Sequence, residues 1–434
     1  MNATATLNDG TITAQQTKHT GFALAKMLLE YGVEYIFGIP GGQTLPLYDA
    51  SYAYREELKH LLFRDERSAG HAACAYSRIS GKLGVCDATV GPGATNLPSA
   101  LGEALNSSTP MIAIVGEHPV PWVNKVEYGR ASQGIDQIGM LKHVCKKVIY
   151  VPTQECLPEL VRTAFLEATS GRPGPVALVI PADVFRQEGA PANMDVYIDP
   201  SLNHFPSRRS APDPYDVKRA AQLLREAKRP VMLIGGGALV SGAMQAAREL
   251  AEQLSMPVVY TITGKGTIPD DHNLNMGVVG IFANAPSAEA ALREADLVFL
   301  VGNKSSQSSS FAWTLPRAEQ KVVHLDIDPA EVGRIFRTDV GLVGDAKLGL
   351  EGLLNALPGA DGTGVDFEWL AQLRGGKAAW EEKKAKLFAI NAKPIQPYRV
   401  MGALNAVLDL EDILVCDAGF ASGWGALYYS QRSP

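Results

Sequence analysis

The chain has 434 residues, 46% of them hydrophobic, and a formal net charge of −6 at pH 7. This length is sufficient for two or three domains with sizeable cores. The acidic balance argues against nucleic acid or an anionic membrane as a partner, and no apolar run reaches the roughly 18–20 residues that span a bilayer.

The first residues and the cysteines indicate the compartment. Residues 1–19 are polar and lack the apolar core of a signal peptide, so we expect a flexible tail there. The five cysteines form no CxxC pair, which is typical of a reduced compartment. Together these features predict a cytoplasmic protein.

Residues 20–185 alternate short apolar strands with helices. A first helix with an apolar face ends near Gly32. Strands are predicted at 35–39, 61–63, 84–90, 111–115 and 176–180. Because short apolar strands that alternate with helices form parallel sheets covered on both faces, we predict a doubly wound α/β domain.

The remainder of the chain divides into further segments. Residues 186–212 are rich in Pro and Ser without periodicity, which predicts a linker. A second α/β domain is expected at 213–357, with strands at 231–234, 258–261, 297–301 and 322–327. A linker and a charged helix are expected at 358–392. Residues 393–434 are predicted to form the beginning of a third α/β unit, with a helix at 398–408 and a strand at 413–416.

Three motifs of the first domain follow the ends of predicted strands. They are PGG at 40–42, the charged cluster RDER at 64–67, and GPGATN at 91–96. Open α/β sheets bind ligands at the carboxyl ends of their strands, and glycines there let backbone N–H groups approach a ligand. From charge alone, RDER is more typical of a solvated turn than of a catalytic site, and GPG alone would be an ordinary turn.

The order of these motifs resembles the pyrimidine-binding domain of thiamine diphosphate enzymes, in the acetolactate synthase-like branch (large or catalytic subunit). In that family a glutamate hydrogen-bonds N1′ of the cofactor's aminopyrimidine, whose imino nitrogen then takes the C2 proton of the thiazolium ring. The resemblance implies that Glu66 is this catalytic residue. It also implies a cofactor-binding set of Pro40, Gly41, Gly42, Gly91, Pro92, Gly93 and Asn96.

A second catalytic candidate is Gln133, in ASQGIDQ. It aligns with the glutamine of a phenylalanine-glutamine-acid motif in acetolactate synthases. Ser132 stands where that motif has phenylalanine, which leaves the native substrate open. His71 and His118 are the imidazoles nearest to the motif turns. Either could transfer protons, but a satisfied structural histidine is the favoured interpretation.

The second domain begins with a glycine-rich turn at 235–237, which lacks the full GxGxxG spacing of a dinucleotide loop. Segments 264–277 and 324–334 resemble the middle domain of the same family. Acetolactate synthases bind FAD there through a segment that typically reads G-x-R-F-D-D-R. Here GNKSSQ at 302–307 lacks the arginine and both aspartates, so we expect no FAD and a supporting role. A different nucleotide, such as ADP or a coenzyme A moiety, is the alternative.

The segment DAGFAS at 417–422 resembles the first diphosphate-contacting turn of the family's third domain, which implies cofactor contacts from Gly419, Phe420 and Ala421. The family's main anchor, a Gly-Asp-Gly turn followed by asparagines that hold Mg²⁺, does not occur in the sequence. We therefore expect the metal ligands beyond Pro434, none within the chain, and most of the diphosphate-binding domain to be missing.

The resemblance implies a thiamine diphosphate- and Mg²⁺-dependent transferase or lyase. Such an enzyme decarboxylates a 2-oxo acid and passes the acyl group to an acceptor, as acetolactate synthase-like carboligases do. The alternatives are a non-ligating decarboxylase of the benzoylformate or phosphonopyruvate type, and a catalytically silent fragment or nucleotide-binding partner subunit. In the family the site lies between subunits, which implies a homodimer or homotetramer.

Overall fold

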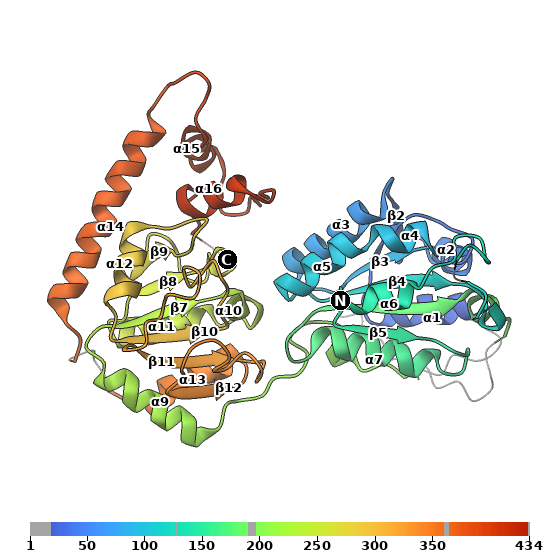
Figure 1. The fold of residues 1–434 in the computed structure, drawn as a ribbon, viewed down its shortest axis with the longest axis horizontal. Helices are drawn as coiled ribbons and strands as arrows, with labels where there is room; N and C mark the ends of the chain where they lie inside the picture. The colour runs from blue at the N-terminus through green and yellow to red at the C-terminus, as the bar shows by residue number, and fades with distance from the viewer. Residues whose placement is uncertain (1–18, 123, 127, 190–196, 360–363, 433–434) are drawn as a thin grey trace, which may run out of the picture. The chain divides into compact units, whose positions relative to one another are not determined.

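The computed structural model describes residues 19–122, 124–126, 128–189, 197–359 and 364–432. The chain divides into two compact units, Met1–Arg208 and Arg209–Pro434. Each unit is built on one sheet of parallel strands with helices packed around it (Figure 1). This arrangement confirms the predicted α/β fold with doubly wound parallel sheets.

The sheet of the first unit has the strand order β2-β1-β3-β4-β6-β5, and its strand pairs are all parallel. Its strands are β1 (Tyr35–Gly38), β2 (Lys59–Leu62), β3 (Gly84–Ala88), β4 (Met111–Glu117), β5 (Lys147–Tyr150) and β6 (Pro175–Pro181). From β1 the chain moves outward to β2 and then crosses back to β3 on the other side. The carboxyl ends of β1 and β3 therefore flank a topological switch point, where sheets of this kind bind ligands.

Helices cover both faces of this sheet (Figure 1). They are α1 (Thr20–Glu30), α2 (Leu45–Ala53), α3 (Glu66–Ser80), α4 (Pro92–Asn96), α5 (Pro98–Ser107), α6 (Gln137–Lys142), α7 (Leu157–Thr169) and α8 (Ala182–Arg186), with short 3₁₀ turns η1 (Val120–Trp122) and η2 (Pro200–Leu202). Because side chains alternate along a strand, Ile112 and Ile114 of β4 enter one apolar core, with α1 and α7. Ala113 and Val115 enter the other, with α3 and α5.

The second unit repeats the plan with the order β12-β11-β10-β7-β8-β9. Its strands are β7 (Pro230–Ile234), β8 (Val258–Tyr260), β9 (Asn275–Val278), β10 (Leu297–Val301), β11 (Lys321–Asp326) and β12 (Val340–Val343). Its helices are α9 (Pro214–Glu226), α10 (Gly236–Val240), α11 (Met244–Gln253), α12 (Pro286–Glu294) and α13 (Ala346–Ala356), with the 3₁₀ turn η3 (Ile262–Gly264). One continuous apolar core surrounds this sheet.

Three further helices belong to the second unit: α14 (Phe367–Phe388), α15 (Pro397–Val407) and α16 (Phe420–Tyr428). The charged helix predicted in 358–392 starts at Phe367, because the Asp366 carboxylate caps it by accepting from the Trp369 N–H at 3.0 Å. Its first turns bury Trp369, Leu370 and Leu373 in the core of the unit. The start of α14 is thus fastened to the second sheet.

The strand predicted at 413–416 is wrong. The segment has no strand conformation, and Ile413 and Val415 are 59% and 83% exposed. No strand of the described residues lies beside it, so its backbone groups have no ladder to join. An apolar run indicates a strand only where a neighbouring strand pairs with it.

Candidate functional site

Glu66 is the first residue of α3, the helix that follows β2 after residues 63–65. The preceding Asp65 ends the turn, because its Oδ1 accepts from the backbone N–H groups of Arg67 at 2.8 Å and Ser68 at 3.2 Å. Arg67 is exposed, whereas Glu66 is only 8% exposed. The cap therefore places the Glu66 side chain inside the unit, in contrast to the solvated turn that charge alone also allowed.

The two oxygens of the Glu66 carboxylate differ in their surroundings. Asn96, the last residue of α4, donates its Nδ2 to Oε2 at 2.8 Å. A Cβ added at Gly93 would lie 3.2 Å from Oε1. Oε1 accepts no hydrogen bond from the described residues. One oxygen is thus held in place, while the other faces a glycine with no side chain and remains open to a donor.

Gly91, at the N-terminus of α4, requires glycine for two reasons. Its φ is +66°, in the region that favours glycine, and an added Cβ would lie 2.3 Å from the Gln133 carbonyl oxygen. Its N–H donates to Gln137 Oε1 at 3.1 Å. The fold thus brings the backbone of Gln133 against the GPGATN turn, although they are far apart in sequence.

Gln137 and Glu117 are site residues that the sequence analysis missed. Gln137 is completely buried, and its Nε2 donates to Gly116 O and Glu117 Oε2, both at 2.8 Å. Burial raises the pKa of Glu117, and bonds from the His118 N–H and Gln137 oppose this shift. In the polar stretch around Gln137, nothing in the sequence distinguishes a buried glutamine from a surface one.

The PGG loop after β1 packs against the ends of β3 and β4. A Cβ added at Gly41 would lie 2.1 Å from Thr89 Cβ, and the Thr89 hydroxyl donates to Gln43 Oε1 at 2.8 Å. A Cβ added at Gly116 would lie 2.7 Å from Gln43 Cβ. Gly42, in contrast, has open space where a Cβ would point. The predicted residues 40–42 thus adjoin the strand ends that carry the GPGATN turn and Glu117.

A buried polar network, also missed from sequence, crosses the sheet near this site. Asp87, completely buried at the end of β3, accepts from the Tyr48 hydroxyl at 2.7 Å, and its Oδ1 lies 2.8 Å from His60 Nε2. A Cβ at Gly38 would lie 1.8 Å from the same Oδ1, so only glycine lets Asp87 reach across β1. Burial raises the pKa of Asp87, the His60 and Tyr48 bonds lower it, and the charge of Glu66 adds to the increase.

The glycine-rich turns of the second unit contact their own chain. A Cβ added at Gly235 would lie 2.1 Å from Gly302 O, and Gly302 has a φ of +54°. These glycines therefore allow the loops after β7 and β10 to pack closely. Beyond them, Asn303 is buried and accepts from the Ser305 N–H at 2.7 Å, while its Nδ2 has no partner in the described part of the chain.

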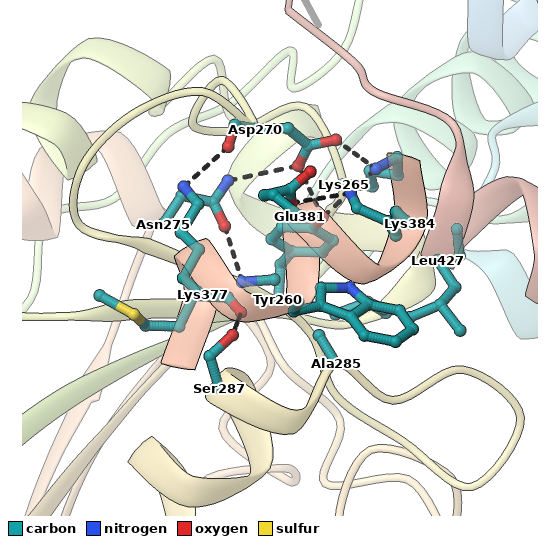
Figure 2. Close-up of a pocket in the computed structure, with 15 residues that line it drawn as sticks. Tyr260, Lys265, Asp270, Asn275, Ala285, Ser287, Lys377, Glu381, Lys384 and Leu427 are labelled. Carbon is teal, nitrogen blue, oxygen red and sulfur yellow. Dashed lines mark hydrogen bonds and ion pairs between the residues drawn. The ribbon is translucent and has the colours of Figure 1, made fainter. Parts of the chain in front are cut away.

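A small pocket of the second unit is lined by charged side chains from 260–275 and α14 (Figure 2). Asp270, one of the lining residues, accepts from the Tyr260 hydroxyl at 2.6 Å and forms an ion pair with Lys265. Lys377 donates to the backbone oxygen of Asp270 at 2.9 Å. Burial lowers the pKa of both lysines. These side chains bond to one another, and Lys377 belongs to α14, so their hydrogen bonds and ion pair hold α14 against residues 260–275.

The remaining predicted residues, Gly419, Phe420 and Ala421, lie at the start of α16 in the second unit. Gly419 has a φ of +99°, and Phe420 is 76% exposed. They therefore belong to a different unit from Glu66. The described residues hold no group of three or more His, Cys, Asp or Glu side chains arranged to bind a metal ion.

Comparisons with known proteins agree on a family. Residues 18–140 match the family "Thiamine pyrophosphate enzyme, N-terminal TPP binding domain", and residues 217–353 match "Thiamine pyrophosphate enzyme, central domain". A probable acetolactate synthase large subunit of Methanocaldococcus jannaschii is 37% identical over 422 residues, 95% of this chain and 68% of the relative. The acetolactate synthase large subunit of Corynebacterium glutamicum is 34% identical over 420 residues, 95% of this chain and 64% of the relative.

The chain belongs to the thiamine pyrophosphate enzyme family. Its two family matches fall one in each compact unit. None of the described helices is long and apolar enough to cross a membrane.

The surroundings of Glu66 fit the aminopyrimidine ring of this family's cofactor. Oε1 accepts no hydrogen bond from the described residues, so it is available as an acceptor for a ring N–H that reached it. Gly93 places no side chain between Oε1 and such a ring. The opposite oxygen is already held by Asn96. The Glu66 carboxylate thus has one oxygen bonded by Asn96 and one oxygen that can accept a hydrogen bond from a ligand N–H.

The two histidines noted in the sequence differ in environment. His71, on α3, is exposed. His118, directly after β4, is 4% exposed, and its Nε2 has no hydrogen-bond partner among the described residues. The expectation of a satisfied structural histidine is thus wrong for His118. Burial without a partner also lowers the pKa of this imidazole.

Proposed function

We propose that this protein is a thiamine diphosphate- and Mg²⁺-dependent carboligase of the acetolactate synthase type. Its substrate is a 2-oxo acid, which it decarboxylates before transferring the acyl group to a second carbonyl compound. The observation that carries the proposal is the buried Glu66 carboxylate, with Oε2 held by Asn96 and Oε1 open beside Gly93. The 37% identity to a probable acetolactate synthase large subunit supports the reaction class.

Each residue of the site has a defined task in this proposal. Glu66 accepts a hydrogen bond from N1′ of the aminopyrimidine, and Asn96 keeps the carboxylate in the orientation that this bond requires. Gly91 and Gly93 let the ring approach the backbone. When bound, thiamine diphosphate supplies the carbon nucleophile that attacks the keto carbon of the substrate. Glu66 thereby controls the protonation of the ring that activates this nucleophile.

Gln133 is proposed as the second catalytic residue. Its carbonyl packs against Gly91, and this contact keeps residues 132–134 next to the GPGATN turn. Its φ of +63° is uncommon for a residue other than glycine, and such backbone is found at functional sites when the surroundings impose it. Its exposed side chain is available to a substrate.

We further propose a cytoplasmic homodimer or homotetramer. All five cysteines are free thiols, which supports a reduced compartment. In the proposed assembly the pyrimidine-binding unit of one subunit completes a site with a second subunit.

Product analysis tests the proposed reaction. The full-length protein is incubated with pyruvate, thiamine diphosphate and Mg²⁺, and the products are identified by NMR. Acetolactate is the expected product. Acetaldehyde alone would replace the proposal by simple decarboxylation. No product, although calorimetry shows bound cofactor, would reject both reactions.

A further inference from the structure

His118 lies at the edge of the sheet where the site residues gather. It directly follows β4, next to β3 in the sheet. Side chains alternate along a strand, and Glu117 faces Gln137 on one side. Gly116 faces Gln43 of the PGG loop on the other side. The strand end that carries Glu117 and meets Gln43 through Gly116 therefore leads directly into His118.

The imidazole of His118 is held in place by its neighbours. Its ring stacks on Trp122 of η1, with ring centroids 5.9 Å apart. The η1 turn is itself fastened, because the Val120 N–H donates to both carboxylate oxygens of Asp183, at 3.1 and 3.2 Å. An ordered ring loses little further freedom on binding a ligand, which favours recognition.

The ring nevertheless has an unsatisfied nitrogen. His118 is 4% exposed, and Nε2 is buried with no hydrogen-bond partner in the described residues. Folding does not gain from such a group, since leaving it unpaired is unfavourable. A ligand that binds at this edge could supply the partner. Burial lowers the pKa of His118, which favours the neutral imidazole with its single N–H.

We propose that His118 donates a hydrogen bond from Nε2–H to the keto oxygen of the 2-oxo acid substrate. This inference rests on the proposed function. When a carbon nucleophile adds to the keto carbon, the new C–C bond forms and the π electron pair of C=O moves onto the oxygen. The developing negative charge strengthens the bond from Nε2–H, so His118 stabilises the transition state more than the bound substrate. His118 is thus a further catalytic residue.

Two substitutions at His118 and one control test the inference by kinetics. His118→Phe keeps a flat ring against Trp122 and removes the donor. It should lower kcat with pyruvate by about 10²-fold, with KM nearly unchanged, as for the loss of one oxyanion donor. His118→Gln can present an amide N–H near the Nε2 position and should recover part of this loss. His71→Gln, at the exposed histidine, should match the wild type.

Two other measurements test whether a lower kcat in His118→Phe comes from weaker cofactor binding or from a less stable fold. The affinity for thiamine diphosphate, measured by calorimetry, should not change in His118→Phe. Its melting temperature should not fall, since the substitution removes a buried nitrogen that has no partner in the described part of the chain. A wild-type kcat in His118→Phe would overturn the role of His118 while leaving the proposed function intact.

An NMR experiment on the wild-type protein separates the two proposals and does not depend on variant folding. The ¹⁵N signal of His118 Nε2 is recorded with thiamine diphosphate present, before and after pyruvate is added. A shift on addition is expected, and a signal that does not move would overturn the inference. Absence of turnover in the wild type, with the shift present, would reject the carboligase but retain the contact.

Discussion

At the residue scale, the position of Glu66 follows from how α3 begins. Anions are favoured at helix N-termini, and Asp65 already satisfies two backbone N–H groups of the first turn. Glu66 is therefore free to direct its carboxylate toward Asn96 and Gly93 rather than to its own helix. Asp65 thus caps the helix, while the adjacent Glu66 supplies the carboxylate of the candidate site.

We predict that Glu66→Gln keeps the fold, because the amide is nearly isosteric, but slows cofactor activation by about 10²–10⁴. The measurement is C2–H/D exchange of bound thiamine diphosphate, followed by NMR. Glu103→Gln, at an exposed glutamate of α5, is the control and should exchange at the wild-type rate. Unchanged exchange in Glu66→Gln would remove Glu66 from the mechanism.

A pair of glycine substitutions tests the buried network. In Gly38→Ala the new Cβ would lie 1.8 Å from Asp87 Oδ1, so the carboxylate must leave His60. Breaking such a buried pair should lower the free energy of unfolding by about 3–5 kcal/mol. In Gly42→Ala the new Cβ meets no atom of the described residues within 4 Å, so this variant should stay within about 0.5 kcal/mol of the wild type. Urea unfolding measures both, and equal losses would contradict the role of Gly38.

At the element scale, the parallel strands explain why some buried polar groups titrate abnormally. β11 lies inside the second sheet, between β10 and β12, and its His324 is 2% exposed. Strands buried on both faces are mostly apolar, so a histidine there is unusual. Burial lowers the pKa of His324, and a bond to Asn303 O opposes the shift only in part.

A pH-dependent loss of stability follows. Because the folded pKa of His324 is lowered from its ordinary value of 6.5, the unfolded state takes up a proton first as the pH falls. The contribution to stability is thus complete above about pH 6.5 and is lost as the pH falls toward the folded pKa. Urea unfolding at pH 7.5 and at pH 5.5 should show a smaller pH-dependent loss for His324→Gln than for the wild type. His204→Gln, at an exposed histidine, is the control. An equal loss of the free energy of unfolding between pH 7.5 and pH 5.5 in all three proteins would contradict the prediction.

At the scale of the whole molecule, exposed apolar side chains support the proposed assembly. Leu62 of β2 and Ile79 of α3 are 72% and 61% exposed in the single chain. Obligate dimers bury about 2,000 Å² or more of such surface. We predict a mass in solution of at least twice 46.4 kDa, measured by sedimentation equilibrium. A monomer at micromolar concentration would contradict the proposal.

The second unit provides another whole-molecule prediction. The segment after β10 lacks the arginine and aspartates expected for FAD, and Gly235 and Gly302 pack on each other. We therefore predict that the purified protein is colourless and needs no flavin for activity. Its visible absorption spectrum checks this. A flavin band that co-purifies in stoichiometric amount would refute the prediction.

Much of the fold and part of the candidate site could be predicted from the sequence. Buried parallel strands are continuous apolar runs, so β4 and β10 are visible without coordinates. Glycine-rich turns after such runs mark the carboxyl edge of the sheet, which is why 40–42, Glu66 and 91–96 could be named. These features are local, because a strand and its turn are neighbours in the chain.

Only the tertiary structure decided the rest. The strand expected at 413–416 does not form, because the described part of the chain offers this apolar run no neighbouring strand to pair with. The Asp87–His60 contact across Gly38 and the burial of Gln137 join residues from separate elements. The Nε2 of His118 lacks a partner among the residues that the structure describes. The burial of a polar side chain and its hydrogen-bond partners depend on which strands lie side by side. The order of residues along the chain does not determine this strand order.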